Sequence, residues 1–268
     1  MEKGNMKKLG FALGAGGSRG VAHIGFLQAM EEAGIRPDFV TGCSMGSIVG
    51  ACFSAGVSSA AMKDAVIGLR LGDIAAFNAA PFHRNGLMRM SKARKRIVDL
   101  IGERTFSELN IPFACVATDL EAGRTIVLSE GNVADAVIAS SSIPGAFTPA
   151  SFGKYETLVD GGILERVPTK QLKKMGAEVI VAVDVLGDLI IEKKVQDNLL
   201  GTLLRCIDVM DTRATQKKRS GRRYVDLWLE PALGSMDQYA VKNLEFAYDK
   251  GYELGMANAE KIAELIER

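Results

Sequence analysis

The sequence is short of histidine and cysteine. Only two histidines occur in its 268 residues, His23 and His83, and none follows position 83. The four cysteines form no C-x-x-C pair and lie in apolar runs, so we expect reduced core thiols rather than disulfides or a cysteine-bound metal. No metal ion and no cofactor is predicted.

Long apolar runs and an excess of charge are also missing. No stretch reaches the roughly 18 uncharged apolar residues that a membrane-spanning helix needs. The start, MEKGNMKK followed by LGFALGAGG, is basic and then apolar, but glycines interrupt it and no convincing cleavage site follows, so a signal peptide is not predicted. A formal net charge of +1 gives no reason to expect nucleic acid as a partner. The expected location is cytoplasmic.

Short apolar runs alternate with segments of helical periodicity. This alternation predicts an α/β fold with a mostly parallel central sheet and helices on both faces. No repeat or linker divides the chain, so residues 8–268 are expected to form a single domain after a short lead-in, residues 1–7. The predicted strands are residues 8–13, 39–42, 113–118, 125–128, 155–159, 179–185 and 224–229, and the predicted helices are residues 20–33, 45–55, 58–69, 133–140, 168–175, 199–217 and 244–266.

A G-x-S-x-G pattern stands where a predicted strand passes into a predicted helix. Ser44 is its serine, between Gly42 and Gly46. A tight turn at this place strains the serine backbone and exposes the hydroxyl above the sheet, and the helix start favours negative charge there. The pattern is typical of a hydrolase nucleophile, although three fixed positions also occur by chance.

A glycine-rich turn, residues 14–20, follows the first predicted strand. Its backbone N–H groups can face an anion, either a phosphate or the oxyanion of an acyl intermediate. The dinucleotide motif G-x-G-x-x-G is not matched, because Arg19 stands in place of the third glycine. No Gly-Lys-Ser/Thr follows, which excludes a P-loop. A glycine turn that only packs closely is the structural alternative.

The base is not expected to be a histidine. In α/β-hydrolases the order is serine, acid, histidine, and no histidine of this chain is in that place. We expect His23 to have a local partner on a helix face and His83 to be a solvated loop residue.

A carboxylate at the end of a strand is the remaining candidate for the base. Asp160 ends the apolar run of residues 155–159 and is followed by two glycines. Ligands bind at the carboxyl ends of strands in open α/β sheets. A carboxylate with a pKa of about 3.9 is a weak base, so it needs close orientation and a partly dry pocket. Asp119 and Asp184 also end apolar runs, and an aspartate that only caps a turn is common, so these alternatives stay open.

Three motifs in this order resemble the patatin-like phospholipase family, in particular its bacterial single-domain members. The family signature is G-G-G-x-R-G, then G-x-S-x-G, then D-G-G or D-G-A. The corresponding segments here are residues 15–20, 42–46 and 160–162, and residues 117–121 and 139–145 are also similar to bacterial members.

The resemblance implies a patatin-like Ser–Asp hydrolase fold and calcium-independent hydrolysis of lipid acyl esters. By position, Ser44 is the nucleophile and Asp160 the base. The implied oxyanion hole consists of Gly16, Gly17 and Ser18. Alanine at position 15, where the family commonly has glycine, leaves the identity of the oxyanion donors open. The residues that support the motifs are Gly14, Arg19, Gly20, Gly42, Gly46, Gly161 and Gly162.

Other segments bear on the substrate and partners. Residues 84–96 and 217–223 are rich in Lys and Arg, which indicates solvated helix faces or contact with anionic lipid at the inner membrane face. Residues 71–87 form either a packed connection, which we prefer, or a cover over an acyl pocket. The alternative functions are a soluble esterase or thioesterase on non-membrane acyl substrates and a catalytically weak regulatory protein on the same fold. Acyl chain length, headgroup and oligomeric state are not indicated.

Overall fold

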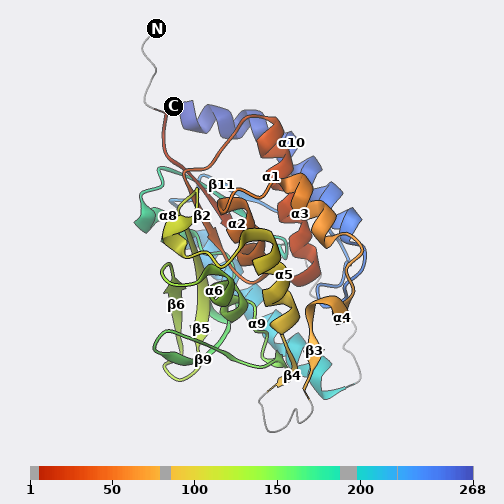
Figure 1. Ribbon diagram of the computed structural model, residues 1–268. Coiled ribbons are helices and arrows are strands. Elements are labelled where there is room, and N and C mark those ends of the chain that lie inside the picture. Colours follow the sequence, from red (N-terminus) through yellow and green to blue (C-terminus); the bar gives the residue numbers. More distant parts are fainter. Residues whose placement is uncertain (1–5, 79–85, 188–197, 222, 268) are drawn as a thin grey trace.

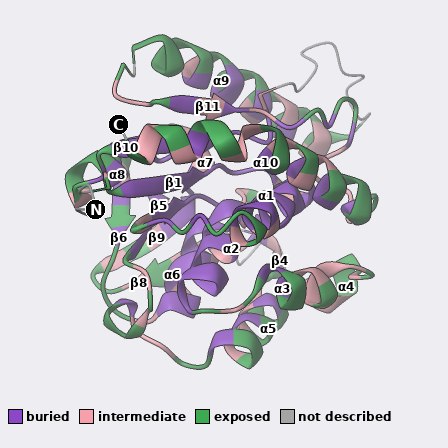
Figure 2. Cartoon of the chain, turned by 90° about the horizontal axis from the view of Figure 1, so that it is seen from above, coloured by how far each residue is buried: buried purple, intermediate pink, exposed green. Residues whose placement is uncertain are grey.

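A computed structural model describes residues 6–78, 86–187, 198–221 and 223–267. The predictions on the N-terminal lead-in (residues 1–5), His83, Arg84 and Arg222 lie outside the described residues. The chain forms one α/β domain with a central sheet between layers of helices (Figure 1). Strands of this sheet are largely buried, whereas helices such as α5 (Ser91–Ile101) and α9 (Leu199–Gly221) present exposed outer faces (Figure 2).

The central sheet has the strand order β11-β10-β1-β2-β5-β9-β8, and β6 pairs with β5. Strands β11, β10, β1, β2 and β5 are parallel, whereas β6, β8 and β9 run antiparallel to their neighbours. Five of the eight described strands of this sheet are therefore parallel, as the predicted mostly parallel sheet requires, and the antiparallel strands lie on the β5 side. The bounds are β1 Leu9–Leu13, β2 Phe39–Gly42, β5 Phe113–Asp119, β6 Arg124–Leu128, β8 Ala150–Phe152, β9 Tyr155–Asp160, β10 Val179–Val183 and β11 Leu227–Leu229.

Helices cover both faces of the sheet because the central strands are apolar on both sides. Phe11 of β1 belongs to the larger core, which packs against α1, α2 and α10, whereas Ala12 faces the smaller core around Leu172 of α8. The helices are α1 Ala22–Glu32, α2 Met45–Ser54, α3 Ser59–Val66, α4 Leu71–Ile74, α5 Ser91–Ile101, α6 Val133–Ser140, α7 Gly162–Glu165, α8 Thr169–Met175, α9 Leu199–Gly221 and α10 Leu244–Glu267, with 3-10 turns η1 Gly17–Val21 and η3 Phe106–Glu108.

Ser58 caps α3, since its hydroxyl accepts a hydrogen bond from the Ala61 amide at 3.3 Å. The helix ends at Val66, three residues before the predicted end. No helix in the described part of the chain is long and apolar enough to cross a membrane.

A second, smaller sheet was not predicted. It consists of β3 Ala76–Phe77, β4 Gly86–Arg89 and β7 Gly145–Phe147 in the order β3-β4-β7. Strands of two to four residues leave no alternation that the sequence could show. The described part of residues 71–87 is tied into this sheet by Asn78, whose side-chain amide donates to the Gly86 carbonyl at 2.6 Å, and residues 79–85 lie outside the described residues.

Candidate active site

Ser44 lies in a strained turn between β2 and α2. Its φ of 53° and ψ of −125° fall in a region that side-chain-bearing residues rarely adopt. The turn is held by Ser140, whose hydroxyl accepts from the Ser44 amide at 3.0 Å and donates to the Val116 carbonyl at 2.7 Å. The Ser47 hydroxyl donates to the Ser44 carbonyl at 2.6 Å. These bonds offset the backbone strain and fix the direction of the serine side chain.

The glycines of this turn are required by close backbone contacts. A Cβ built at Gly46 would lie 2.3 Å from the Leu13 carbonyl oxygen, and one at Gly42 would lie 2.4 Å from the Gly46 carbonyl oxygen. Such distances are far inside van der Waals contact, so a side chain at either position would push α2 away from the sheet. The G-x-S-x-G spacing therefore reflects the packing of α2 against the end of β1.

Asp160 ends β9, which runs antiparallel to β5. The end of β9 nevertheless reaches the carboxyl edge of the parallel strands, because Gly42 pairs with Cys115 and Asp160 pairs with Ala117, two residues further along β5. Ser44 also lies two residues beyond Gly42. From the sequence, Asp160 is expected at this edge by the rule for parallel strands, but β9 is antiparallel. The pairing of β9 with β5 is what places Asp160 there.

The Asp160 carboxylate is buried and has only neutral hydrogen-bond donors among the described residues. The Gly162 amide donates to Oδ1 at 2.8 Å, and the Cys43 thiol lies 3.9 Å from the same oxygen. Burial raises the pKa of Asp160 to about 6, against the lowering effect of hydrogen bonds from the Ser44 hydroxyl, the Gly162 amide and the Cys43 thiol. The carboxylate is therefore a stronger base than an exposed aspartate and is in contact with the serine.

The glycine-rich turn presents backbone amides on the same cavity. In the described part of the chain, the amides of Gly16 and Gly17 have no backbone hydrogen-bond partner, whereas the Ser18 amide donates to the Gln238 carbonyl at 2.9 Å. A Cβ at Gly17, where φ is 51°, would lie 2.2 Å from that same carbonyl oxygen. Of the three predicted oxyanion donors, the amides of Gly16 and Gly17 are thus open to a ligand, whereas the Ser18 amide is already hydrogen-bonded to Gln238.

The other motif residues support these positions. Arg19 is fully buried, and its guanidinium donates to the carbonyls of Val185 at 2.7 Å and Gly234 at 2.9 Å, which ties the glycine turn to the C-terminal part of the chain. The remaining motif glycines leave little room for a side chain. A Cβ at Gly14 would contact the Val183 carbonyl, and one at Gly20 would contact Met45. A Cβ at Gly161 would contact the Val116 carbonyl, and one at Gly162 would contact the Asp160 side chain.

The alternative bases are engaged elsewhere. His23 is buried with Nε2 2.8 Å from the Gly14 carbonyl, and burial lowers its pKa to about 4. The Asp119 carboxylate accepts hydrogen bonds from the backbone amides of Glu121 and Ala122 and so caps the turn that follows β5. Asp184 accepts from Arg166 at 2.8 Å. None of these side chains lines the cavity that contains Ser44.

This cavity has a volume of about 60 Å³. Its volume would accommodate only a few water molecules and is smaller than the roughly 300 Å³ of an ordinary ligand pocket. Four of its polar lining residues were not predicted, because α9 and the segment after β11 carry no motif. Its lining includes Gly16, Gly17, Ser44, Ile143, Pro144, Asp160, Ile163, Ile207 and the unpredicted Asp208, Asp211, Gln238 and Tyr239.

Three of the four unpredicted residues bind one another. Asp208 of α9 accepts from the Tyr239 hydroxyl at 2.5 Å and from the Gln238 side-chain amide at 2.8 Å. Asp211, one turn later, accepts from Arg166 at 2.7 Å. This network joins α9 to the wall of the cavity.

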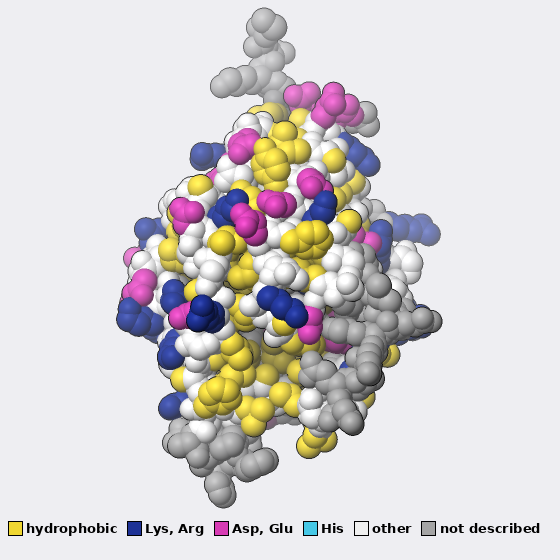
Figure 3. All heavy atoms as spheres, turned by 90° about the vertical axis from the view of Figure 1, so that its right-hand side faces the viewer, with side chains coloured by type: hydrophobic (Ala, Val, Ile, Leu, Met, Phe, Trp, Pro, Cys, Tyr) yellow, Lys and Arg dark blue, Asp and Glu magenta, His cyan; other side chains and the backbone are white. Residues whose placement is uncertain are grey.

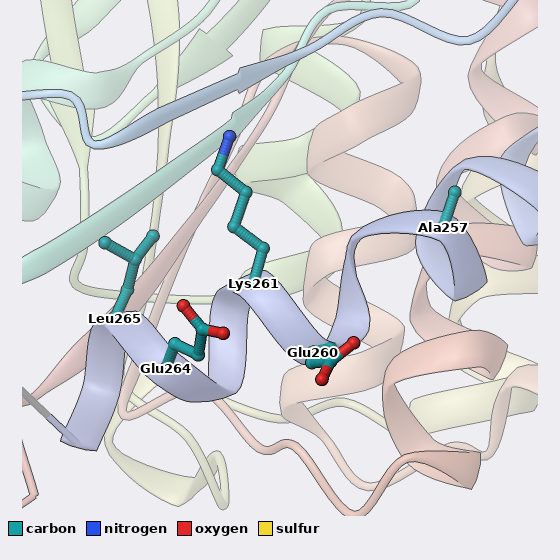
Figure 4. Close-up of a pocket in the computed structure, with 5 residues that line it drawn as sticks. All are labelled: Ala257, Glu260, Lys261, Glu264 and Leu265. Atoms are coloured by element: carbon teal, nitrogen blue, oxygen red, sulfur yellow. The ribbon is translucent and has the colours of Figure 1, made fainter.

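A larger hollow of about 450 Å³ lies on α10 (Figure 4). One helix alone lines it, with Glu260, Lys261 and Glu264 as its charged residues and no nucleophile. It therefore offers no acyl chemistry. Among the described residues, no group of three or more His, Cys, Asp or Glu side chains is placed to hold a metal ion.

Comparison with known proteins agrees with the motifs. The family model described as patatin-like phospholipase matches residues 11–173. An uncharacterized NTE family protein of Mycobacterium bovis is 34% identical over 67% of this chain and 49% of its own length. Lysophospholipase nte1 of Aspergillus fumigatus is 30% identical over 67% of this chain and 12% of its own length. The chain thus spans about half of the first relative and a small part of the second.

The fold has a solved counterpart. The crystal structure of VipD from Legionella pneumophila superposes with a TM-score of 0.58 over 96% of this chain and 67% of that one, at 13% sequence identity. At this identity the likeness concerns the fold alone. The match of the family model to more than half of the sequence confirms the resemblance inferred from the three motifs, and the chain belongs to the patatin-like phospholipase family.

Proposed function

We propose that this protein is a serine acyl-ester hydrolase in which Ser44 is the nucleophile and Asp160 the general base. The observation that carries the proposal is that Ser44 and the buried Asp160, whose pKa is raised, line one cavity together with Gly16 and Gly17. Nucleophile, base and anion-binding amides are the three parts that acyl transfer requires.

The proposed reaction begins when Asp160 takes the hydroxyl proton as Ser44 Oγ attacks the ester carbonyl. The Gly16 and Gly17 amides hold the oxyanion, and Ser18 contributes only if its bond to Gln238 opens. The intermediate collapses, Asp160 returns the proton to the departing alcohol, and an acyl-serine remains. Water, deprotonated by the same carboxylate, then attacks the acyl-serine, the bond between the acyl carbon and Ser44 Oγ breaks, Asp160 returns the proton to Ser44 Oγ, and the carboxylic acid leaves. A base with a pKa of about 6 suits this work near neutral pH, since it is ionised but not as weakly basic as an exposed aspartate.

The proposed substrate is a lipid acyl ester, as in a phospholipase A or lysophospholipase. The family match and the printed name of the Aspergillus relative support this class. The apolar side chains of Ile143, Ile163 and Ile207 in the cavity wall suit an acyl group rather than a polar one. Because the cavity is small, most of an acyl chain must lie outside it or displace its walls.

A soluble esterase or thioesterase and a weakly catalytic regulatory protein are the competing functions. A cytoplasmic location and contact of residues 84–96 and 217–223 with anionic lipid stay predictions from the sequence.

The test is covalent labelling with a fluorophosphonate together with release of p-nitrophenol from a short acyl ester. Wild type should be labelled and active, and Ser44→Ala should lose both. Ser54→Ala is the matched control, because Ser54 is a buried serine at the end of α2, the helix that follows Ser44, and does not line the cavity. Labelling of Ser44→Ala at the wild-type level would refute the nucleophile, and no labelling of wild type would favour the regulatory alternative. Mass spectrometry of products from a lipid extract separates a lipid hydrolase from a thioesterase.

A further inference from the structure

Helix α9 exposes apolar side chains to the outside. Leu199, Leu203, Cys206 and Met210 are spaced four, three and four residues apart, which places them on one face of the helix. The side chains of Leu199, Leu203 and Met210 are 79%, 51% and 71% exposed. A surface helix of a globular protein normally turns polar residues outward, so this arrangement is the reverse of what folding alone requires.

The opposite face of α9 already has its partners. Leu204 and Asp208 are buried, and Ile207, Asp208 and Asp211 line the cavity that contains Ser44. The exposed apolar side chains of α9 are therefore not needed for packing within this chain. It lies across the thickness of one helix from the proposed site of ester hydrolysis.

Basic residues continue the same stripe. Arg213 and Lys217 follow Met210 at spacings of three and four, and both are exposed. Neither forms an ion pair with another residue in the described part of the chain. We call the six residues Leu199, Leu203, Cys206, Met210, Arg213 and Lys217 the outer face of α9.

The basic helix α5 differs in this respect. Arg94 pairs with Asp135 at 2.6 Å and with Glu103 at 2.9 Å, and Lys95 pairs with Asp99 at 2.8 Å. These cations are neutralised within the protein. Arg213 and Lys217 of α9 are thus better placed to complement an anionic surface than Arg94 and Lys95 of α5.

The exposed apolar area is too small for a stable dimer of this chain. Four such side chains make a patch on the order of 400 Å², whereas a stable protein–protein interface buries roughly 800 Å² per partner. Hydrophobic side chains gather on the lower part of one face of the molecule (Figure 3). An apolar stripe that continues into cations matches the boundary between acyl chains and phosphates.

We propose that the outer face of α9 docks on the surface of a phospholipid bilayer. The apolar half of the stripe enters the boundary below the headgroups, and Arg213 and Lys217 lie among the phosphates. The proposal rests on the proposed function for its substrate, because docking through α9 holds the cavity one helix thickness away from a surface that carries acyl esters. From the sequence, a mainly electrostatic contact between basic segments and anionic lipid is expected. In the proposed docking, apolar side chains make the main contact with the bilayer.

The test is sedimentation with vesicles of phosphatidylcholine containing a minor fraction of phosphatidylglycerol. Leu203→Glu/Met210→Glu should bind these vesicles at least about tenfold more weakly than wild type, because two apolar side chains no longer enter the lipid. Phe246→Glu/Met256→Glu is the matched control: these residues of α10 are 43% and 48% exposed, and this variant should bind as wild type does. Hydrolysis of p-nitrophenyl butyrate should stay within about twofold of wild type in both variants, since neither touches the cavity.

A second pair of variants keeps the test independent of folding and of catalysis. Arg213→Glu/Lys217→Glu should weaken binding to the phosphatidylglycerol vesicles and leave binding to pure phosphatidylcholine unchanged. Ser44→Ala should bind vesicles like wild type. A wild-type protein that binds vesicles but hydrolyses no ester would refute the proposed function and not the docking face. Unchanged binding of Leu203→Glu/Met210→Glu, no binding of wild type, or a wild-type dimer that these substitutions convert to a monomer would each overturn the docking proposal.

Discussion

Two buried groups of carboxylates lie close together and differ in their partners. Asp160 has neutral donors, namely a hydroxyl, an amide and a thiol. Asp184 and Asp211 share one guanidinium, that of Arg166, at 2.8 and 2.7 Å. Burial raises the pKa of both Asp160 and Asp211, but a cation opposes it only at Asp211.

The difference indicates how one fold keeps a carboxylate available for proton transfer beside others that only hold structure. A buried carboxylate with neutral partners can accept a proton without breaking an ion pair. A carboxylate bound to a buried guanidinium cannot do so without leaving that charge uncompensated. The protein thus accepts a loss of stability at Asp160, whereas at Asp211 the Arg166 guanidinium offsets part of the cost of the buried charge.

Replacing Asp160 by Asn should have the largest effect and should act in opposite directions on activity and stability. We expect ester hydrolysis to fall about a thousandfold, because the base is lost. At pH 7 the variant should be more stable by about 2 kcal/mol, because the amide avoids the cost of a buried charge. Kinetics and urea unfolding measure the two effects. A variant that is both inactive and less stable would show that Asp160 is mainly structural.

Replacing Arg166 by Met should have the converse result. Two buried carboxylates would lose their cation, and we expect the free energy of unfolding to fall by about 3 kcal/mol. Arg219→Met is the control, since it breaks a largely exposed pair with Glu230 and should cost less than about 1 kcal/mol. Equal losses in urea unfolding would remove the contrast between the buried and exposed pairs.

The pH dependence tests the raised pKa directly. The value of kcat/KM should fall about tenfold per pH unit below about pH 6, as Asp160 becomes protonated in the free enzyme. The free energy of unfolding should change in the opposite direction, because protonated Asp160 is favoured in the folded state. The stabilising contribution of Asp160 is fully present below its unfolded pKa of 3.8 and is lost as the pH rises through about 6. His23→Gln should keep the same acid limb in kcat/KM. If the decrease in kcat/KM at acid pH disappears in His23→Gln, the group that titrates near pH 6 is His23 and not Asp160.

Ser140→Ala should have the smallest effect. It removes the hydroxyl that accepts from the Ser44 amide, and we expect a loss of about 1 kcal/mol in stability and a decrease in kcat of less than about tenfold. The neighbouring Ser141→Ala is a close control, because the buried Ser141 hydroxyl has no hydrogen-bond partner among the described residues. If both variants behave alike, the bond to Ser140 does not hold the nucleophile turn.

Much of the fold was predictable because its strands are short apolar runs between helices with clear periodicity. The antiparallel direction of β9 was not, since direction is set by pairing with β5 and leaves no mark in the sequence of residues 155–160. The small sheet was missed because strands such as Ala76–Phe77 are too short to show a pattern.

The site was predictable where chemistry and backbone geometry act together. Gly42, Ser44 and Gly46 form a pattern because close packing and catalysis both restrict them. Asp208 and Tyr239 were not foreseen, because they reach the cavity from distant segments through tertiary packing alone. A lone aspartate in a long helix carries no signal of the cavity that it lines.

The positive φ of Ser44 also limits which nucleophile this turn can present. Threonine has a hydroxyl of similar reactivity, but its branched Cβ is poorly tolerated at a φ of 53°. Cysteine adds no branch and fits the same backbone. Evolution at this position is therefore restricted by sterics before reactivity is considered: a change of nucleophile from oxygen to sulfur is open to this chain, whereas a change from a primary to a secondary alcohol would require the turn itself to be rebuilt.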